Sequence, residues 1–202
     1  KRFIYLALFA LTLALLPGLA SSWEEALLLT MTVGLNPIMG SDIIFGMNDS
    51  FVLAWLVLGL WLLQRQRYHW ASLSLGLAWA SKSTTWFLAP FYALYLAQGA
   101  NNLATAVRQS WRRLWPAVAV SAALVAPFLI WNPIALYDDV WAWSAGTSAT
   151  PYQIRGWGLS NLVLALGLVA SDQAYFPFWL PQVLVCLPLL LAALRWQAQA
   201  NT

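Results

Sequence analysis

Residues 3–20 read FIYLALFALTLALLPGLA and contain no charged side chain. A helix that crosses a membrane needs about 20 consecutive, mostly apolar residues, with a lower limit of about 17. Two further stretches, Leu114–Trp131 and Tyr175–Leu194, meet the same requirement. These three stretches predict membrane-spanning helices, and the rest of the chain is interpreted around them.

The composition of the whole chain agrees with a membrane protein. Of its 202 residues, 61% are hydrophobic and 8% are charged, and the mean hydropathy is +0.67. Soluble domains contain roughly a quarter charged residues, so this chain has too few charges to cover a water-exposed surface. The composition therefore excludes a soluble enzyme, a nucleic-acid-binding module and a disordered segment. The chain has a net charge of +3. In a membrane protein, such a small excess of Lys and Arg mostly comes from the cytoplasmic loops between spans.

The long apolar runs predict an all-α fold, a polytopic transmembrane helical bundle of about six to eight spans. Some spans are short: Phe51–Gln64 and Trp157–Ala170 would need tilt, a thin membrane or polar ends that reach the headgroups. No internal repeat divides the chain, so we expect residues 1–202 to form a single transmembrane domain. Because the chain begins with Lys1 rather than Met and is hydrophobic from Phe3, we expect it to be an internal or C-terminal part of a longer protein.

Basic residues predict which side of the membrane each loop faces. They form two clusters, which consist of Arg65, Arg67 and His69 in the first and of Arg108, Arg112 and Arg113 in the second. Cytoplasmic loops are enriched in Lys and Arg, so both clusters should be cytoplasmic. The chain must then cross the membrane an even number of times between them, which two short helices, Trp70–Ser81 and Trp86–Ala97, would satisfy. Their junction at Lys82 should reach the extracytoplasmic side.

The segment 36–50 interrupts the apolar pattern with polar residues and helix breaks. Pro37 disfavours helix at the residue before it, and Asn48-Asp49-Ser50 offers a cap for a following helix. Asp49 has two interpretations: it only caps that helix, or it faces a polar cavity between spans and binds a hydroxyl, a proton or a cation. For Asp42 we expect a solvated position in a loop.

Lys82 is the second unusual polar residue, because it lies between apolar stretches. An ionisable residue at the centre of a membrane costs about 2.5–3.5 kcal/mol or more. Two interpretations are open. In the first, the lysine extends to the lipid headgroups. In the second, its ammonium binds an anion such as a phosphate, together with freed backbone N–H groups at a helix break and with the neighbouring hydroxyls of Ser81, Ser83, Thr84 and Thr85.

A third polar region follows Trp131 and is expected to be a long outer loop. It combines Trp and Tyr residues with the adjacent acids Asp138 and Asp139 and with Arg155. Aromatic rings stack on the C–H groups of sugars while carboxylates and amides bind the hydroxyls, so this loop is suited to bind a sugar. The aromatic residues alone are equally typical of the belt at a membrane interface, which does not explain the acidic pair or Arg155.

Other residue types indicate no different chemistry. The sequence contains no His/Cys spacing typical of metal sites, and no phosphate-binding loop, serine-hydrolase motif or dinucleotide-binding motif. Cys186 lies in an apolar run and is interpreted as a packing residue of a helix. His69, in a basic turn, is interpreted as a solvated residue.

Three segments, taken in order, resemble the GT-C superfamily of polytopic membrane glycosyltransferases. The resemblance is closest to the bacterial and archaeal mannosyltransferase-like branch, which uses polyprenyl-phosphate sugars. The segments cover about residues 36–160: they are Asn36-Pro37 with Gly46-Met47-Asn48-Asp49, then Gly76-Leu77-Ala78-Trp79-Ala80-Ser81-Lys82 with Pro90, and last Pro127-Phe128 with Trp131-Asn132-Pro133 and Tyr137-Asp138-Asp139.

The resemblance implies an inverting transfer of a mannose-like hexose from a polyprenyl-phosphate donor to an acceptor hydroxyl. The transfer would occur at the extracytoplasmic face of a bacterial or archaeal plasma membrane. A carboxylate would act as general base, and a basic residue would neutralise the departing lipid phosphate. On this basis Lys82 contacts the phosphate and Asp49 is a catalytic acidic residue of the cavity. The candidates for substrate binding are Asn48, Lys82, Asp138, Asp139 and Arg155.

In this superfamily the principal catalytic Asp lies in the first outer loop. That loop would precede Lys1, so the principal base would lie outside residues 1–202 and this piece alone should be inactive. Some members use a divalent cation, Mg²⁺ or Mn²⁺, for which only carboxylates are available here as ligands. The expected partners are the lipid-linked sugar donor and membrane lipids, and not nucleic acid. Two alternatives to the enzyme stay open: a transporter or flippase for a lipid-linked or anionic solute, and a structural membrane subunit.

Overall fold

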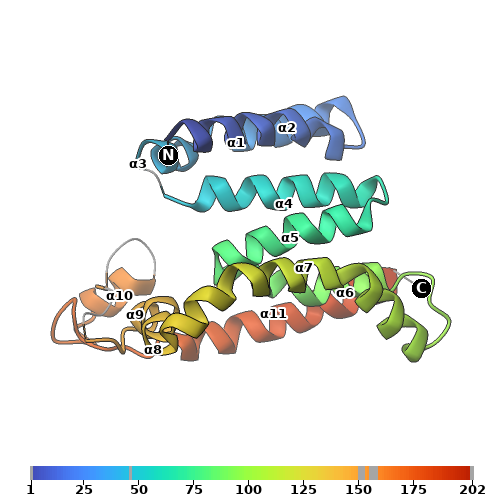
Figure 1. The fold of residues 1–202 in the computed structure, drawn as a ribbon. Helices are drawn as coiled ribbons and strands as arrows, with labels where there is room; N and C mark the ends of the chain where they lie inside the picture. The colour runs from blue at the N-terminus through green and yellow to red at the C-terminus, as the bar shows by residue number, and fades with distance from the viewer. Residues whose placement is uncertain (1, 46, 150–152, 155–158, 201–202) are drawn as a thin grey trace. The chain divides into compact units, whose positions relative to one another are not determined.

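The computed structural model describes residues 2–45, 47–149, 153–154 and 159–200, which form helices and no strands (Figure 1). The first eight are α1 (Arg2–Leu15), η1 (Leu16–Leu19), α2 (Trp23–Gly34), α3 (Pro37–Phe45), α4 (Asp49–Gln64), α5 (Tyr68–Ser81), η2 (Ser83–Leu88) and α6 (Ala89–Leu96). They are followed by α7 (Leu103–Trp131), α8 (Pro133–Tyr137), η3 (Asp138–Ala142), α9 (Trp143–Ala145), α10 (Leu159–Ala165) and α11 (Trp179–Ala200). The predicted all-α fold is confirmed.

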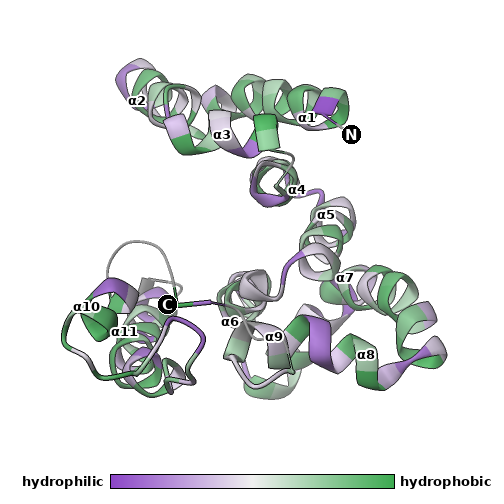
Figure 2. Cartoon of the chain, turned by 90° about the vertical axis from the view of Figure 1, so that its left-hand side faces the viewer, coloured by the Kyte–Doolittle hydropathy of each residue, from purple (hydrophilic) through white to green (hydrophobic). Residues whose placement is uncertain are grey.

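Three helical segments among the described residues are long and apolar enough to cross a membrane: Arg2–Leu19, Leu103–Trp131 and Trp179–Gln199. Between 0 and 17% of the most apolar window of each segment is buried inside the protein, so most of these apolar side chains are exposed, as expected of a surface that contacts lipid. Figure 2 shows hydrophobic residues along most of α1. The pair α2 and α3, bent by 45°, adds a fourth candidate if the two helices form one span.

The expected count of six to eight spans also includes shorter helices. α4 is apolar and has 16 residues, which corresponds to a length of about 24 Å. By contrast, the described part of the stretch Trp157–Ala170 forms only α10, a helix of 7 residues. Such a helix is about 11 Å long and is much shorter than the hydrocarbon core of about 30 Å.

The two helix breaks predicted from the sequence are present. α2 ends at Gly34 and α3 begins at Pro37, where the Asn36 Oδ1 accepts a hydrogen bond from the Ile38 N–H at 2.9 Å. The second break separates α5 from η2 at Lys82, whose backbone is extended with φ −156° and ψ 120°. These breaks place polar residues at helix ends rather than inside helices.

Contacts divide the described chain into two units, residues 2–125 and 126–200. The centre of the first unit is the pair α4 and α5, which lie side by side and are joined by a short turn at 65–67 (Figure 1). Small buried residues, Ala54 in α4 and Ala71 and Ala78 in α5, let the two backbones approach closely. The Ser74 Oγ donates a hydrogen bond to the Trp55 carbonyl at 2.7 Å. These two helices and their turn form a hairpin, the α4–α5 hairpin, which brings the start of α4 close to the end of α5.

α5 also packs closely against α7. A Cβ added at Gly76 would lie 2.5 Å from the Ala117 carbonyl oxygen, a separation at which side chains clash. The Ser121 Oγ donates to the Gly76 carbonyl at 2.9 Å, and the Ser72 Oγ donates to the Arg113 carbonyl at 2.6 Å. Hydroxyl groups thus connect the two helices, as is common in membrane proteins.

The second unit contains more helix than the sequence predicted. The region after Trp131, expected as a long loop, forms α8, the π-helix η3 and α9 in succession. The Asn132 Oδ1 caps α8 by accepting a hydrogen bond from the Ala135 N–H at 3.0 Å, and Pro133 occupies the first helical position. This cap and the proline, both favourable at a helix start, explain why the chain turns directly into a new helix.

Candidate functional site

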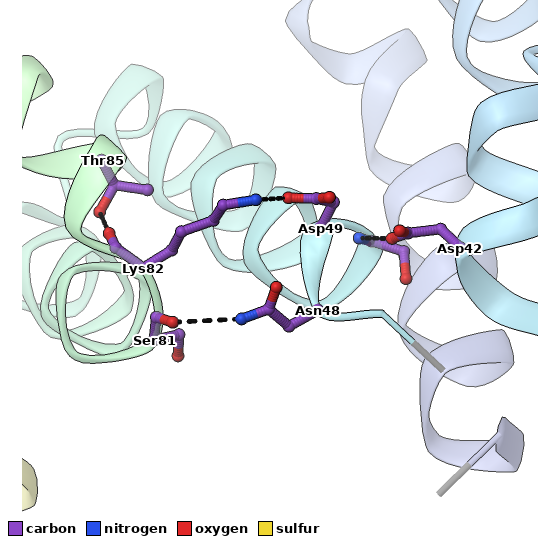
Figure 3. A network of polar contacts seen from close by, with 7 residues as sticks. Asp42, Asn48, Asp49, Ser81, Lys82 and Thr85 are labelled. Carbon is purple, nitrogen blue, oxygen red and sulfur yellow. Dashed lines mark hydrogen bonds and ion pairs between the residues drawn. The ribbon is translucent and has the colours of Figure 1, made fainter. Parts of the chain in front are cut away.

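Lys82 and Asp49 form an ion pair between the Nζ and Oδ1 atoms (Figure 3). Asp49 is the first residue of α4 and Lys82 directly follows the last residue of α5. The side chains are 34% exposed for Lys82 and 44% for Asp49, so the pair is half-buried and still open on one side. Because both belong to the α4–α5 hairpin, they lie at the end opposite the basic turn at 65–67.

The backbone around Lys82 explains its position. The Thr85 Oγ1 donates to the Lys82 carbonyl at 2.7 Å, and the Thr85 N–H donates to the same oxygen at 3.1 Å. Thr85 itself is buried, with 6% of its surface exposed. These bonds start the 3₁₀-helix η2 directly after α5, and Lys82 is held between the two helices with its ammonium directed at α4. The Lys82 side chain therefore forms an ion pair with a carboxylate of the protein and is also partly exposed.

Asn48 connects the same two helix ends. It occupies the N-cap position of α4, but its side chain accepts no capping hydrogen bond there. Instead its Nδ2 donates to the Ser81 carbonyl at 3.3 Å (Figure 3). The structure thus brings together three of the predicted site residues, Asn48, Asp49 and Lys82.

Asp42 differs from its predicted role as a solvated loop acid. It lies in α3, is only 2% exposed, and accepts a hydrogen bond from the Ser50 N–H at 2.6 Å (Figure 3). The first N–H groups of a helix have no partner within the helix, and a carboxylate beside them is stabilised by the helix dipole. Asp42 therefore caps α4 from a neighbouring helix, which leaves the Asp49 carboxylate to Lys82.

The remaining predicted residues belong elsewhere in the chain. Asp138 and Asp139 begin η3 in the second unit, where Asp138 is half-buried and Asp139 is exposed. Arg155 and Gly46, the latter from the motif before Asn48, lie outside the described residues. Sugar binding by the acidic pair and by Arg155 stays a prediction.

The described residues do not gather the ligands of a metal site. No three His, Cys, Asp or Glu side chains within them lie close enough to hold an ion together. Asp49 contributes one carboxylate, and that carboxylate pairs with Lys82. The donor set around Asp49 is thus a poor match to Mg²⁺ or Mn²⁺, which bind several oxygen ligands.

An apolar pocket of about 430 Å³ is lined in part by residues that precede and follow the helix break at Lys82. It is lined by Trp79, Trp86, Ala89, Val118, Ser121, Ala122 and Val125. Trp79 and Trp86 flank Lys82 in the sequence, and the Trp86 Nε1 donates to the Trp79 carbonyl at 3.0 Å. The sequence did not predict this pocket, because four of its seven lining residues come from α7, far along the chain.

This arrangement is chemically suited to a lipid phosphate. A lysine ammonium has three N–H donors; Asp49 accepts one, and two are left for the oxygens of an anion. The helix break beside Lys82 is open to one side, and the apolar pocket can accept a hydrocarbon chain. A charged headgroup and an apolar tail are the two parts of a lipid phosphate.

Residues 1–98 match the model of a protein family described as alpha-(1->6)-mannopyranosyltransferase, N-terminal domain. The matched range extends from α1 through α6 and includes Asn48, Asp49 and Lys82. Over this range the chain is similar to a family of mannosyltransferases, which supports a glycosyltransferase, and together with the apolar helices it indicates a membrane protein. No curated protein and no solved structure matches the chain.

Proposed function

We propose that this chain forms part of a multi-pass membrane glycosyltransferase that moves a mannose-like hexose from a polyprenyl-phosphate donor to an acceptor hydroxyl. The observation that carries the proposal is the half-buried ion pair of Lys82 and Asp49 at a helix break, within the range that is similar to mannosyltransferases. The basic turn at the other end of the α4–α5 hairpin favours an extracytoplasmic position for the pair.

Lys82 is assigned to the leaving group. In the transfer, the acceptor oxygen forms a bond to the anomeric carbon of the sugar while the bond from that carbon to the phosphate oxygen breaks. The departing polyprenyl phosphate gains negative charge, which the Lys82 ammonium stabilises. The proton of the acceptor hydroxyl passes to a carboxylate base, to which we assign none of the described residues. No step of this mechanism uses a metal ion.

Asp49 is assigned to hold the Lys82 ammonium in place. Its carboxylate is an acceptor for one of the three ammonium hydrogens, so the lysine is already oriented before the donor binds. A group that is positioned in advance stabilises a developing charge without reorganising during the reaction. On this proposal Asp49 acts on the phosphate through Lys82.

The apolar pocket lined by Trp79 and Trp86 is assigned to the first isoprene units of the donor. Its lining comes from Trp, Ala and Val side chains with the single hydroxyl of Ser121. A hydrocarbon chain in this pocket gains van der Waals contacts with these side chains, which add affinity that the phosphate alone does not have.

The test is transfer of labelled mannose from polyprenyl-phosphate mannose by membranes that contain the whole protein. Wild type should transfer the label, whereas Lys82→Ala and Asp49→Asn should lose transfer while inserting into the membrane at wild-type levels. Lys82→Arg, which keeps the charge, should retain more activity than Lys82→Ala. Arg67→Ala removes a positive charge at the opposite end of the hairpin and is the matched control.

Two results would contradict the proposal. The first is a transfer rate near that of wild type in both Lys82→Ala and Asp49→Asn. The second is the absence of transfer with any common lipid-linked sugar from a well-expressed wild-type protein. The second result would favour the transporter, because an ammonium beside a helix break is also typical of transporter binding sites.

A further inference from the structure

A second pocket, of about 700 Å³, lies between the start of α5 and the first turns of α7. Its lining includes Tyr68 and His69 from α5 and Thr105, Arg108, Gln109 and Arg112 from α7. α5 has 14 residues, so about 21 Å separates its two ends. The pocket is therefore distinct from the site at Lys82, which lies at the other end of the same helix.

The lining is strongly basic. Arg108, Arg112 and Arg113 contribute to it and no acidic residue does. The α7 residues of the lining are spaced three and four positions apart, which places them on one face of the helix. Within the described part of the chain, Arg108 and Arg112 have no carboxylate within salt-bridge distance. Their charges are thus free to bind an anion.

Arg113 has a different role. Its Nη1 donates to the Leu96 carbonyl at 3.0 Å, and its guanidinium carbon lies 4.0 Å from the centre of the Tyr68 ring. These contacts hold the wall of the pocket together, whereas Arg108 and Arg112 are exposed. Arg113 therefore stabilises the wall of the pocket, while the guanidinium groups of Arg108 and Arg112 are exposed and can bind a ligand.

The start of α5 adds to the positive potential. Arg67 is the N-cap residue of this helix, and its side chain makes no capping hydrogen bond. The first backbone N–H groups of a helix lack intrahelical partners, and the helix dipole favours an anion beside them. Tyr68 and His69, the first two residues of α5, both line the pocket.

The length of α7 indicates how deep the pocket lies. The helix has 29 residues and is about 44 Å long, which exceeds the hydrocarbon core of about 30 Å. Its apolar stretch begins at Leu114, so the basic turns before that residue extend into the headgroup layer. Trp111 and Trp115, which are 58% and 51% exposed, lie at this boundary as aromatic residues of an interfacial belt do.

We propose that this basic pocket binds the phosphate of an anionic membrane lipid, at the membrane face opposite Lys82. Guanidinium groups bind phosphate oxygens with paired hydrogen bonds, and clusters of Arg beside a span attract anionic headgroups. The pocket has room for a headgroup, and its position between two helices would let the bound lipid stabilise their packing.

The experiment measures the thermal unfolding temperature of the full chain in neutral detergent while phosphatidylglycerol or phosphatidylcholine is added. A ligand that binds only the folded state raises this temperature. Phosphatidylglycerol should raise it and phosphatidylcholine should not. In Arg108→Gln/Arg112→Gln the apparent affinity should fall about 30-fold, and Arg108→Lys/Arg112→Lys, which keeps the charge, should recover part of the loss.

The matched control is Arg65→Gln/Arg67→Gln, which removes the same charge from the neighbouring turn outside the pocket. An equal loss of affinity in this control would overturn the proposal in favour of general surface attraction. Equal stabilisation by glycerol phosphate at the same concentration would overturn the lipid assignment in favour of a soluble anion. Neither outcome depends on sugar transfer, so the result is independent of the proposed enzyme activity.

Discussion

Lys82 and Asp49 are 33 positions apart in the chain and form an ion pair across the open end of the α4–α5 hairpin. The pair joins the last turn of one helix to the first residue of another. In a chain of which only 8% is charged, the two opposite charges lie together instead of each being solvated separately. Because a paired charge is far less costly near lipid than an isolated one, this contact stabilises the hairpin as well as forming the candidate site.

A double-mutant cycle tests the contribution of this pair to stability. Lys82→Met or Asp49→Asn alone leaves the other side chain without its partner, whereas the double variant removes both members. Since both side chains are a third or more exposed, we expect a coupling free energy of unfolding of about 1 kcal/mol. Unfolding in detergent, followed by circular dichroism, measures it. Strictly additive effects would show that the two side chains do not interact.

The cap that Asp42 provides to α4 gives a second prediction. Asp42→Ala removes the acceptor of the Ser50 N–H in a buried position and should lower the free energy of unfolding by about 1–2 kcal/mol. Asp42→Asn keeps a carbonyl oxygen as acceptor and should have a smaller effect. The same unfolding assay compares the two variants. Equal losses would indicate that the charge, and not the hydrogen bond, is what α4 requires.

The close contact of α5 with α7 gives a third prediction. Gly76→Ala places a Cβ 2.5 Å from the Ala117 carbonyl oxygen, so the helices must separate, and we expect a loss of about 1–3 kcal/mol in stability. Gly59→Ala is the control, because its new Cβ would have no neighbour closer than 3.5 Å. Thermal unfolding of both variants checks the difference. If Gly76→Ala is tolerated as well as Gly59→Ala, the two helices are less tightly packed than the structure has them.

The apolar pocket gives a fourth prediction, which rests on the proposed function. Ala122→Phe would fill part of a pocket that Ala122 lines, so the KM for a long-chain polyprenyl donor should rise about tenfold. The kcat and the KM for a donor with a short lipid should change little. Ala123→Phe, on the same helix and outside the lining, should behave like wild type. An equal rise in KM for both donors would argue against a tail in this pocket.

The helix breaks at Asn36-Pro37 and at Lys82 were predictable because their causes are local. Proline restricts the residue before it and lacks a donor, and a polar run inside an apolar stretch ends a span whatever packs around it. The same holds for the start of α4, which begins within the predicted Asn48-Asp49-Ser50 segment. A local cause, the cap that Asn132 provides to α8, also explains the first helix after Trp131, where the aromatic and acidic residues predict a loop.

Asp42 shows where local reasoning fails. An acid in a polar segment is usually solvated, and its own neighbours in the chain give no reason to expect otherwise. It is buried because α3 packs on α4 and the Ser50 N–H needs an acceptor. The available signal was the acid's position among Ile and Met residues, and that signal cannot identify a partner eight residues away.

The amino-acid sequence alone predicts a helical, apolar chain that is suited to a membrane, with polar residues at helix ends. These properties depend on apolar run length, prolines and caps, which act over a few neighbouring residues. The pairing of Asp49 with Lys82, the capping of α4 by Asp42 and the contribution of α7 to both pockets depend on the tertiary fold. Such contacts join residues that are distant in the chain. They depend on how closely small residues such as Gly76 and Ala71 let the helices approach each other.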